Sequence, residues 1–94
     1  LLPTILDFNR DYVGDKYKRL SEAMGIGSGS DPADFIRELN VEMGLPATLS
    51  EMGIQKSAIP ALASHAAKDI CTFTNPRPCT AAEYEVLFAT ALAE

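Results

Sequence analysis

The sequence predicts an all-α chain folded as a helical bundle, and three observations support this fold class. Apolar residues recur at helical spacing from end to end, residues that cap or stop helices separate the periodic stretches, and no stretch alternates apolar and polar residues as a half-buried strand would. With 94 residues, the chain has room for one modest core. We therefore expect residues 1–94 to form a single all-α domain.

The first predicted helix begins at Asp15, whose carboxylate can cap the first turn. Tyr17, Leu20 and Met24 follow at helical spacing, which places them on one face. Gly25 supplies the left-handed conformation that commonly ends a helix. The following "GIGSGSDP" is typical of a flexible joint, so we predict one amphipathic helix and then a linker.

The second predicted helix begins at Asp31 and Pro32, because aspartate is a favoured cap and proline fits the first helical position. Its predicted end is Gly44. Its apolar face is expected to consist of Phe35, Ile36, Leu39 and Met43.

The third predicted helix follows the turn "GLPATLSEMGI", in which Thr48 begins one short turn that Gly53 closes. Ser57 is expected to cap this helix, and Pro60 lies early in it, where proline costs little. Its apolar face is expected to consist of Ile59, Leu62, Ala63, Ala66 and Ile70.

A stiff corner is predicted over residues 72–79, because Pro76 and Pro78 each remove a backbone donor and fix a backbone angle. Thr80 and Glu83 then have the spacing of a capping box, which marks the start of the last helix. Its apolar face is expected to consist of Tyr84, Leu87, Phe88, Ala91 and Leu92, with Glu83 and Glu85 toward water.

The charge balance argues against nucleic acid as a partner. The chain has 8 basic and 13 acidic side chains and a net charge of -5, so its field repels polyanions. No stretch approaches the ~20 apolar residues of a membrane span, and no basic and then apolar leader is present. Low cysteine usage favours a reducing compartment. We therefore predict a cytoplasmic protein without a membrane partner.

Cys71 and Cys79 bracket the predicted corner, which suggests a metal clamp, a disulfide or the rim of a pocket. A zinc site would need further ligands, and the chain has neither a Cys-x-x-Cys pair nor a second histidine. His65 and Asp69 are four residues apart and suggest a partial metal site, but a solvent-facing polar pair explains the same spacing.

Two further patterns suggest chemical sites that their context does not support. The glycines at positions 25, 27 and 29 resemble a nucleotide loop, but they follow a predicted helix where that loop requires a strand. His65 has no nucleophile at a recognisable motif, so no catalytic triad can be assembled. The residues taken alone therefore predict no catalytic, cofactor-binding or metal-ligating side chain.

Four stretches carry a family resemblance: "LLPTILDFN", "GLPATLSEMGI", "AIPALASHAAKDICTFTNPRPCT" and the last helix. In this order they resemble the C-terminal region of the iron-containing (group III) alcohol dehydrogenases over essentially the whole chain. The pieces "GLPATL", "IPALA" and "NPRP" are the most distinctive. The resemblance implies the all-α C-terminal part of a two-domain, dehydroquinate-synthase-like fold, whose N-terminal α/β domain binds NAD(P).

The resemblance also implies hydride transfer between an alcohol or aldehyde and NAD(P), with Fe²⁺ or Zn²⁺ polarising the substrate oxygen. The family's ligands, one aspartate and three histidines, precede the Leu-Leu-Pro run with which this chain starts. The start without methionine suggests a cut through a longer enzyme. This chain alone is therefore expected to bind neither metal nor NAD(P) and to be inactive.

The resemblance gives expectations for Cys71 and Arg77, and the usual burial of free cysteines gives one for Cys79. Family members with a cysteine at the position of Cys71 hold it beside the substrate, so Cys71 is expected to line the substrate pocket sterically. Arg77 is expected at the domain interface, paired with a carboxylate or carbonyls, with a solvated surface charge as the alternative. Cys79 is expected to be a small buried packing residue.

Two other classes of function are kept as alternatives. A stand-alone helical protein-interaction module would need no further domain. A relative of dehydroquinate synthase or glycerol dehydrogenase would share the two-domain plan with another metal and substrate, although "NPRP" favours the alcohol dehydrogenases. The expected partners are a small alcohol or aldehyde and the enzyme's own N-terminal domain, and a homo-oligomer is a further option.

Overall fold

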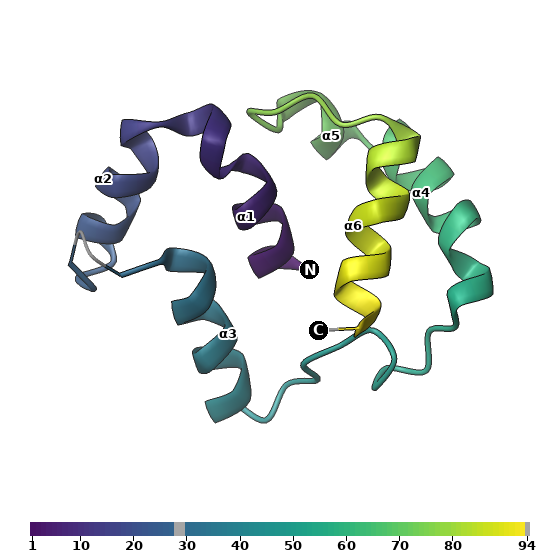
Figure 1. Cartoon of the computed structure of the whole chain (residues 1–94), viewed down its shortest axis with the longest axis horizontal. Helices are drawn as coiled ribbons and strands as arrows, with labels where there is room; N and C mark the ends of the chain where they lie inside the picture. Colours follow the sequence, from purple (N-terminus) through teal and green to yellow (C-terminus); the bar gives the residue numbers. More distant parts are fainter. Residues whose placement is uncertain (28–29, 94) are drawn as a thin grey trace. The chain divides into compact units, whose positions relative to one another are not determined.

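The computed structural model describes residues 1–27 and 30–93 of the chain. These residues form helices and loops without a strand, which confirms the predicted all-α class (Figure 1). The chain divides into two compact units, Leu1–Leu45 and Pro46–Glu94. The expectation of a single domain over residues 1–94 stays a prediction.

Three helices form the first unit: α1 (Leu2–Val13), α2 (Asp15–Ala23) and α3 (Pro32–Glu42). The sequence reasoning did not predict α1. This helix starts after Leu1 without a capping side chain, so the usual signal for a helix start is missing, although Pro3 lies in its first turn. The buried residues of the unit are small, and they are Pro3, Thr4, Asn9, Ser21, Pro32 and Ala33.

The junction between α1 and α2 corrects one predicted cap. Gly14, not Asp15, is the N-cap of α2, and Asp15 is its first helical residue. Gly14 has φ 52° and ψ -122°, a conformation that glycine tolerates best, and it lets two helices meet without a loop. Asp15 in the first turn still interacts favourably with the helix dipole.

The end of α2 agrees with the sequence. Gly25 has φ 74°, and the N–H of Ile26 donates to the carbonyl of Ser21 at 3.2 Å, as in a left-handed helix stop. The glycine at position 29, part of the predicted linker, lies outside the described residues.

The start of α3 is confirmed in detail. The Asp31 carboxylate accepts a hydrogen bond from the N–H of Ala33 at 2.9 Å, and Pro32 occupies the first helical position. Gly44 follows the helix with φ 73°. The predicted apolar face is only partly correct, because Ile36 and Leu39 are half-buried, whereas Phe35 and Met43 are exposed.

The second unit contains the short 3₁₀ helix η1 (Lys56–Ala58) and the helices α4 (Ile59–Lys68), α5 (Ile70–Thr74) and α6 (Ala81–Ala93). Its core lies where α4 packs along α6 (Figure 1). The buried apolar residues there are Ile59, Ala63 and Ala91. Within the described residues no helix is both long and apolar enough to span a membrane.

The entry into α4 differs from the prediction. Ser57 does not cap the helix, because it lies inside η1 and Ala58 is the N-cap without a side-chain hydrogen bond. The 3₁₀ turn already bonds the N–H of Ala58 to the carbonyl of Gln55 at 3.0 Å. Pro60 lies in the first turn of α4, as predicted.

The predicted short turn near residue 50 is present. The N–H of Glu51 donates to the Thr48 hydroxyl at 3.2 Å, and Gly53 closes the turn with φ 84°. The Ser50 hydroxyl then donates to the carbonyl of Leu92 at 2.8 Å, and the N–H of Leu49 donates to the carbonyl of Ala91. The turn therefore satisfies carbonyl groups at the end of α6 that have no partner within the helix.

The capping box of α6 is confirmed. The N–H of Glu83 donates to the Thr80 hydroxyl at 3.2 Å, and the Glu83 carboxylate accepts from the N–H of Thr80 at 3.1 Å. The predicted apolar face is also correct, with Ala91 buried and the other four predicted residues half-buried.

Candidate functional site

The helix that carries Cys71 is separate from α4, which corrects the predicted continuous helix through Ile70. Asp69 leaves the helical conformation with φ -69° and ψ 142° and becomes the N-cap of α5. Its carboxylate accepts from the N–H of Cys71 at 2.8 Å. Ile70, predicted on the packed face of α4, is 78% exposed in this structure. The turn of the chain at Asp69 therefore sets where the side chains of α5 point.

The corner that follows starts later than predicted. Residues 72–74 are still helical in α5, and the chain turns at Asn75, whose ψ is 136°. The Asn75 side-chain N–H donates to the carbonyl of Arg77 at 2.7 Å, which closes the turn around Pro76. The two prolines and this hydrogen bond together make the corner stiff.

Thr72 attaches α5 to the rest of the second unit. Its hydroxyl donates to the carbonyl of Ala66 in α4 at 2.6 Å, and its oxygen lies 2.6 Å from the Tyr84 hydroxyl of α6. A hydroxyl has one hydrogen, so with Thr72 donating to Ala66, the Tyr84 O–H donates to Thr72. The sequence reasoning missed this attachment. Asp69, a common cap residue, was the available signal for a new helix start.

Cys71 is exposed on α5, and its thiol is free. A hydrogen bond with Asp69 and the negative charge of that carboxylate raise the pKa of the Cys71 thiol, with a smaller contribution from burial. The thiol is therefore kept in its neutral form near pH 7. This chemistry does not favour a nucleophilic role.

Arg77 and Cys79 lie in the corner and are both half-buried. Cys79 is free, so the two cysteines form no disulfide, and it is less buried than the sequence suggested. Its Sγ lies 3.8 Å from the carbonyl of Thr80. Burial, and then the charge of Glu83, raise the pKa of the Cys79 thiol, and Arg77 lowers it by less.

The described residues bring no metal-ligand set together. Among residues 1–27 and 30–93, no three histidine, cysteine, aspartate or glutamate side chains group closely enough to hold a metal ion. His65 and Asp69, the pair considered from the sequence, are both exposed, and Asp69 already caps α5.

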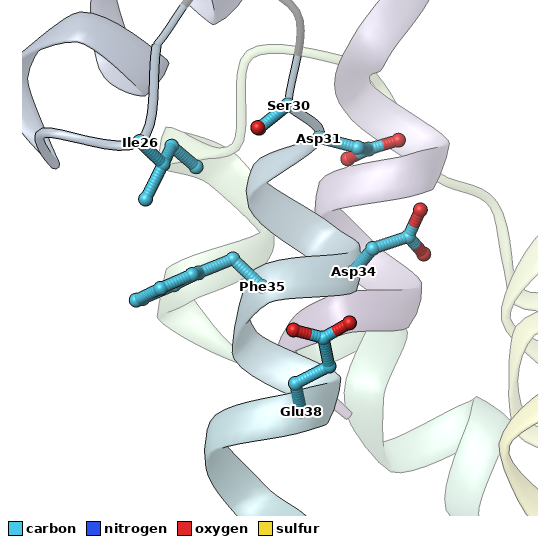
Figure 2. Close-up of a pocket in the computed structure, with 6 residues that line it drawn as sticks. All are labelled: Ile26, Ser30, Asp31, Asp34, Phe35 and Glu38. Atoms are coloured by element: carbon cyan, nitrogen blue, oxygen red, sulfur yellow. The ribbon is translucent and has the colours of Figure 1, made fainter.

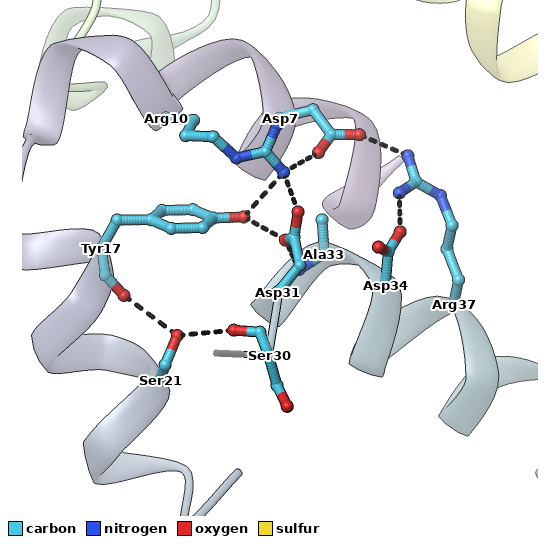
Figure 3. A network of polar contacts seen from close by, with 9 residues as sticks. All are labelled: Asp7, Arg10, Tyr17, Ser21, Ser30, Asp31, Ala33, Asp34 and Arg37. Carbon is cyan, nitrogen blue, oxygen red and sulfur yellow. Dashed lines mark hydrogen bonds and ion pairs between the residues drawn. The ribbon is translucent and has the colours of Figure 1, made fainter. Parts of the chain in front are cut away.

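A polar network links the three helices of the first unit, and no sequence pattern predicted it (Figure 3). Arg10 of α1 forms ion pairs with Asp7 at 2.5 Å and with Asp31 at the start of α3. The Tyr17 hydroxyl of α2 donates to Asp31 at 2.7 Å, and the Arg10 guanidinium lies 5.2 Å from the Tyr17 ring centroid. Asp31 therefore receives donors from all three helices.

The network extends along α3 and toward the linker. Arg37 bridges Asp7 at 2.5 Å and Asp34 at 3.0 Å. The Ser21 hydroxyl lies 3.2 Å from the carbonyl of Ser30 and 3.3 Å from that of Tyr17 (Figure 3). These contacts hold the start of α3 against α1 and α2, which is a structural role.

The network also shifts pKa values. Burial, and then donation of its O–H to Asp31, raise the pKa of Tyr17. Burial acts to raise the pKa of Asp31, but the hydrogen bonds from Tyr17 and the Ala33 N–H, together with the charge of Arg10, lower it overall. Burial likewise acts to lower the pKa of Arg10, and its contact with the Tyr17 hydroxyl, the charge of Asp31 and the hydrogen bond to Asp7 raise it overall.

A shallow hollow of about 420 Å³ lies beside α3 (Figure 2). Ile26 and Phe35 project to one side of the helix, whereas Asp31 and Asp34 project to the other. Both aspartates are already paired, with Arg10 and Arg37 respectively. Ser30 and Glu38 complete the lining. This arrangement of a small apolar surface and engaged carboxylates does not build a chemical site.

The comparisons with known proteins agree with the resemblance. A family model described as "Fe-containing alcohol dehydrogenase family, C-terminal" matches residues 1–92. Lactaldehyde reductase of Escherichia coli K12 is 35% identical over 97% of this chain, and 4-hydroxybutyrate dehydrogenase of Cupriavidus necator is 34% identical over 89%. The NADPH-dependent butanol dehydrogenase of Clostridium saccharobutylicum is 26% identical over 93%.

The matched region is a small part of each relative. The chain spans 26%, 23% and 25% of these three proteins, about a quarter of their length. The match nevertheless covers nearly every residue of the present chain in one continuous stretch. The chain therefore belongs to the iron-containing alcohol dehydrogenase family and corresponds to its C-terminal region.

Proposed function

We propose that this chain works as the all-α C-terminal part of an oxidoreductase that transfers hydride between an alcohol and NAD(P). The observation that carries the proposal is the family match over residues 1–92. The names of the relatives support it, because they describe an aldehyde reductase and alcohol dehydrogenases. The NADPH-dependent butanol dehydrogenase, together with an NAD-dependent methanol dehydrogenase of Bacillus methanolicus that is 27% identical over 97% of this chain, leaves both cofactors as candidates.

The metal and the cofactor are assigned to no residue of this chain. The family is described as Fe-containing, so Fe²⁺, or Zn²⁺ in its place, is the proposed metal of the whole enzyme. The described residues do not fit that metal by themselves, because no three suitable side chains group together. The proposed N-terminal domain would provide the ligands and the NAD(P) site. On this proposal the present chain alone is inactive.

Cys71 is the residue proposed to line the substrate pocket, in a steric role. Its exposure on α5 and its free thiol are compatible with contact to a substrate. The raised pKa of the thiol supports a packing role over a nucleophilic one. The backbone of Cys71 is held in position, because its N–H donates to Asp69 and its carbonyl accepts from the Thr74 hydroxyl at 3.2 Å.

Arg77 is proposed to lie at the interface with the N-terminal domain. It sits in the stiff corner beside Pro76 and Pro78, and its backbone is fixed by the hydrogen bond from Asn75. A planar guanidinium in a rigid loop is suited to pairing with a carboxylate.

The other proposed partners of the enzyme are a small alcohol or aldehyde and, as an option, a second copy of the enzyme. The proposed compartment is the cytoplasm.

The test is alcohol-dependent reduction of NAD⁺ and NADP⁺ by the intact enzyme that carries this chain, compared with the 94-residue chain alone. We expect activity from the first and none from the second.

The second test concerns Cys71. The kcat/KM of Cys71→Ser is expected to stay within about twofold of that of the unaltered enzyme. Cys71→Leu should lower kcat/KM for bulky alcohols by an amount equivalent to about 1 to 3 kcal/mol of lost transition-state stabilisation. Inactivity of Cys71→Ser with fold and metal content intact would replace the steric role with a chemical one. A lack of activity in the intact enzyme would favour a helical protein-interaction module.

A further inference from the structure

We draw no further inference here: the strongest candidate, the exposed apolar side of the short helix α5 that Ile70 and Phe73 form, carries none, because nothing in the described part of the structure shows what covers it.

Discussion

The hydroxyl oxygens of Thr72 and Tyr84 lie 2.6 Å apart, which joins the short helix α5 to α6. Thr72 also donates to the carbonyl of Ala66, so one threonine connects α5 to both neighbouring helices. The exposed side of α5, which carries Ile70 and Phe73, owes its orientation to this pair of contacts.

Removing the Thr72 hydroxyl should destabilise the second unit more than removing that of Tyr84. Tyr84→Phe leaves the bond from Thr72 to Ala66 intact and should cost about 1 kcal/mol. Thr72→Val leaves the Ala66 carbonyl and the Tyr84 hydroxyl without their partner and should cost about 2 to 3 kcal/mol. Urea unfolding of each variant measures both values. Thr90→Val is the control, because its hydroxyl bonds the Val86 carbonyl one turn earlier in the same helix, α6. A loss in Thr90→Val equal to that in Thr72→Val would contradict the connecting role.

Asp31 should be the most sensitive acidic residue of the first unit. Asp31→Ala removes the cap of α3 together with the acceptor of Tyr17 and Arg10, and should cost about 2 kcal/mol or more. Asp31→Asn keeps a capping oxygen and should cost less. The control is Asp34→Asn, since Asp34 is 67% exposed and its pairing with Arg37 should be worth about 0.5 kcal/mol or less. Thermal melting ranks the three variants, and an equal loss in Asp31→Ala and Asp34→Asn would refute the ranking.

The stability of the chain should fall in acid partly through Asp31. The folded-state pKa of Asp31 is lowered, so its contribution is present above its unfolded value of about 3.9 and is lost as the pH falls through the lower folded value. Urea midpoints measured from neutral pH downward should therefore drop below about pH 4. In Asp31→Asn the midpoint should be lower near neutral pH, and its curve should approach that of the unaltered chain in acid. Parallel curves would show that Asp31 does not contribute to the acid dependence.

Alkylation of Cys71 should be slow for an exposed thiol. Asp69 raises the pKa of Cys71, so the reactive thiolate is scarce near pH 7. Asp69→Asn keeps a side chain able to cap α5 and removes the charge, so alkylation of Cys71 should become several times faster. Mass spectrometry of the iodoacetamide-treated chain gives both rates. Cys79 in the same sample is the internal control, because its raised pKa is due first to burial and then to Glu83. An unchanged rate at Cys71 would show that Asp69 does not control its ionisation.

The sequence predicted most of the fold where local rules decide it. The cap at Asp31, the capping box of Thr80 and Glu83 and the stop at Gly44 follow from residues within a few positions of one another. It missed α1 because that helix has no capping side chain at its start. The helical spacing of apolar residues also predicted that the helix continues through Asp69 to Ile70, because this spacing does not change at the break.

The side-chain contacts that join the helices of each unit could not be predicted from residues that are close in the sequence. Arg10 and Asp31 are 21 positions apart, and Thr72 and Tyr84 are 12 apart. Pairs at such separations depend on how helices pack, which spacing along one helix does not encode. Cys71 and Arg77 became candidates through the family resemblance, and their roles stay predictions.

The break at Asp69 separates the residues that pack α4 against α6 from the exposed residues of α5, which one continuous helix would have to carry together. The packing of α4 against α6 depends on residues such as Ile59 and Ala63, which precede the break. The exposed residues after it contribute little to that core, so their replacement should be nearly neutral for stability. Positions 70, 71 and 73 are therefore free to change among related genes without loss of this core, whereas change at Ile59 or Ala63 is limited by folding.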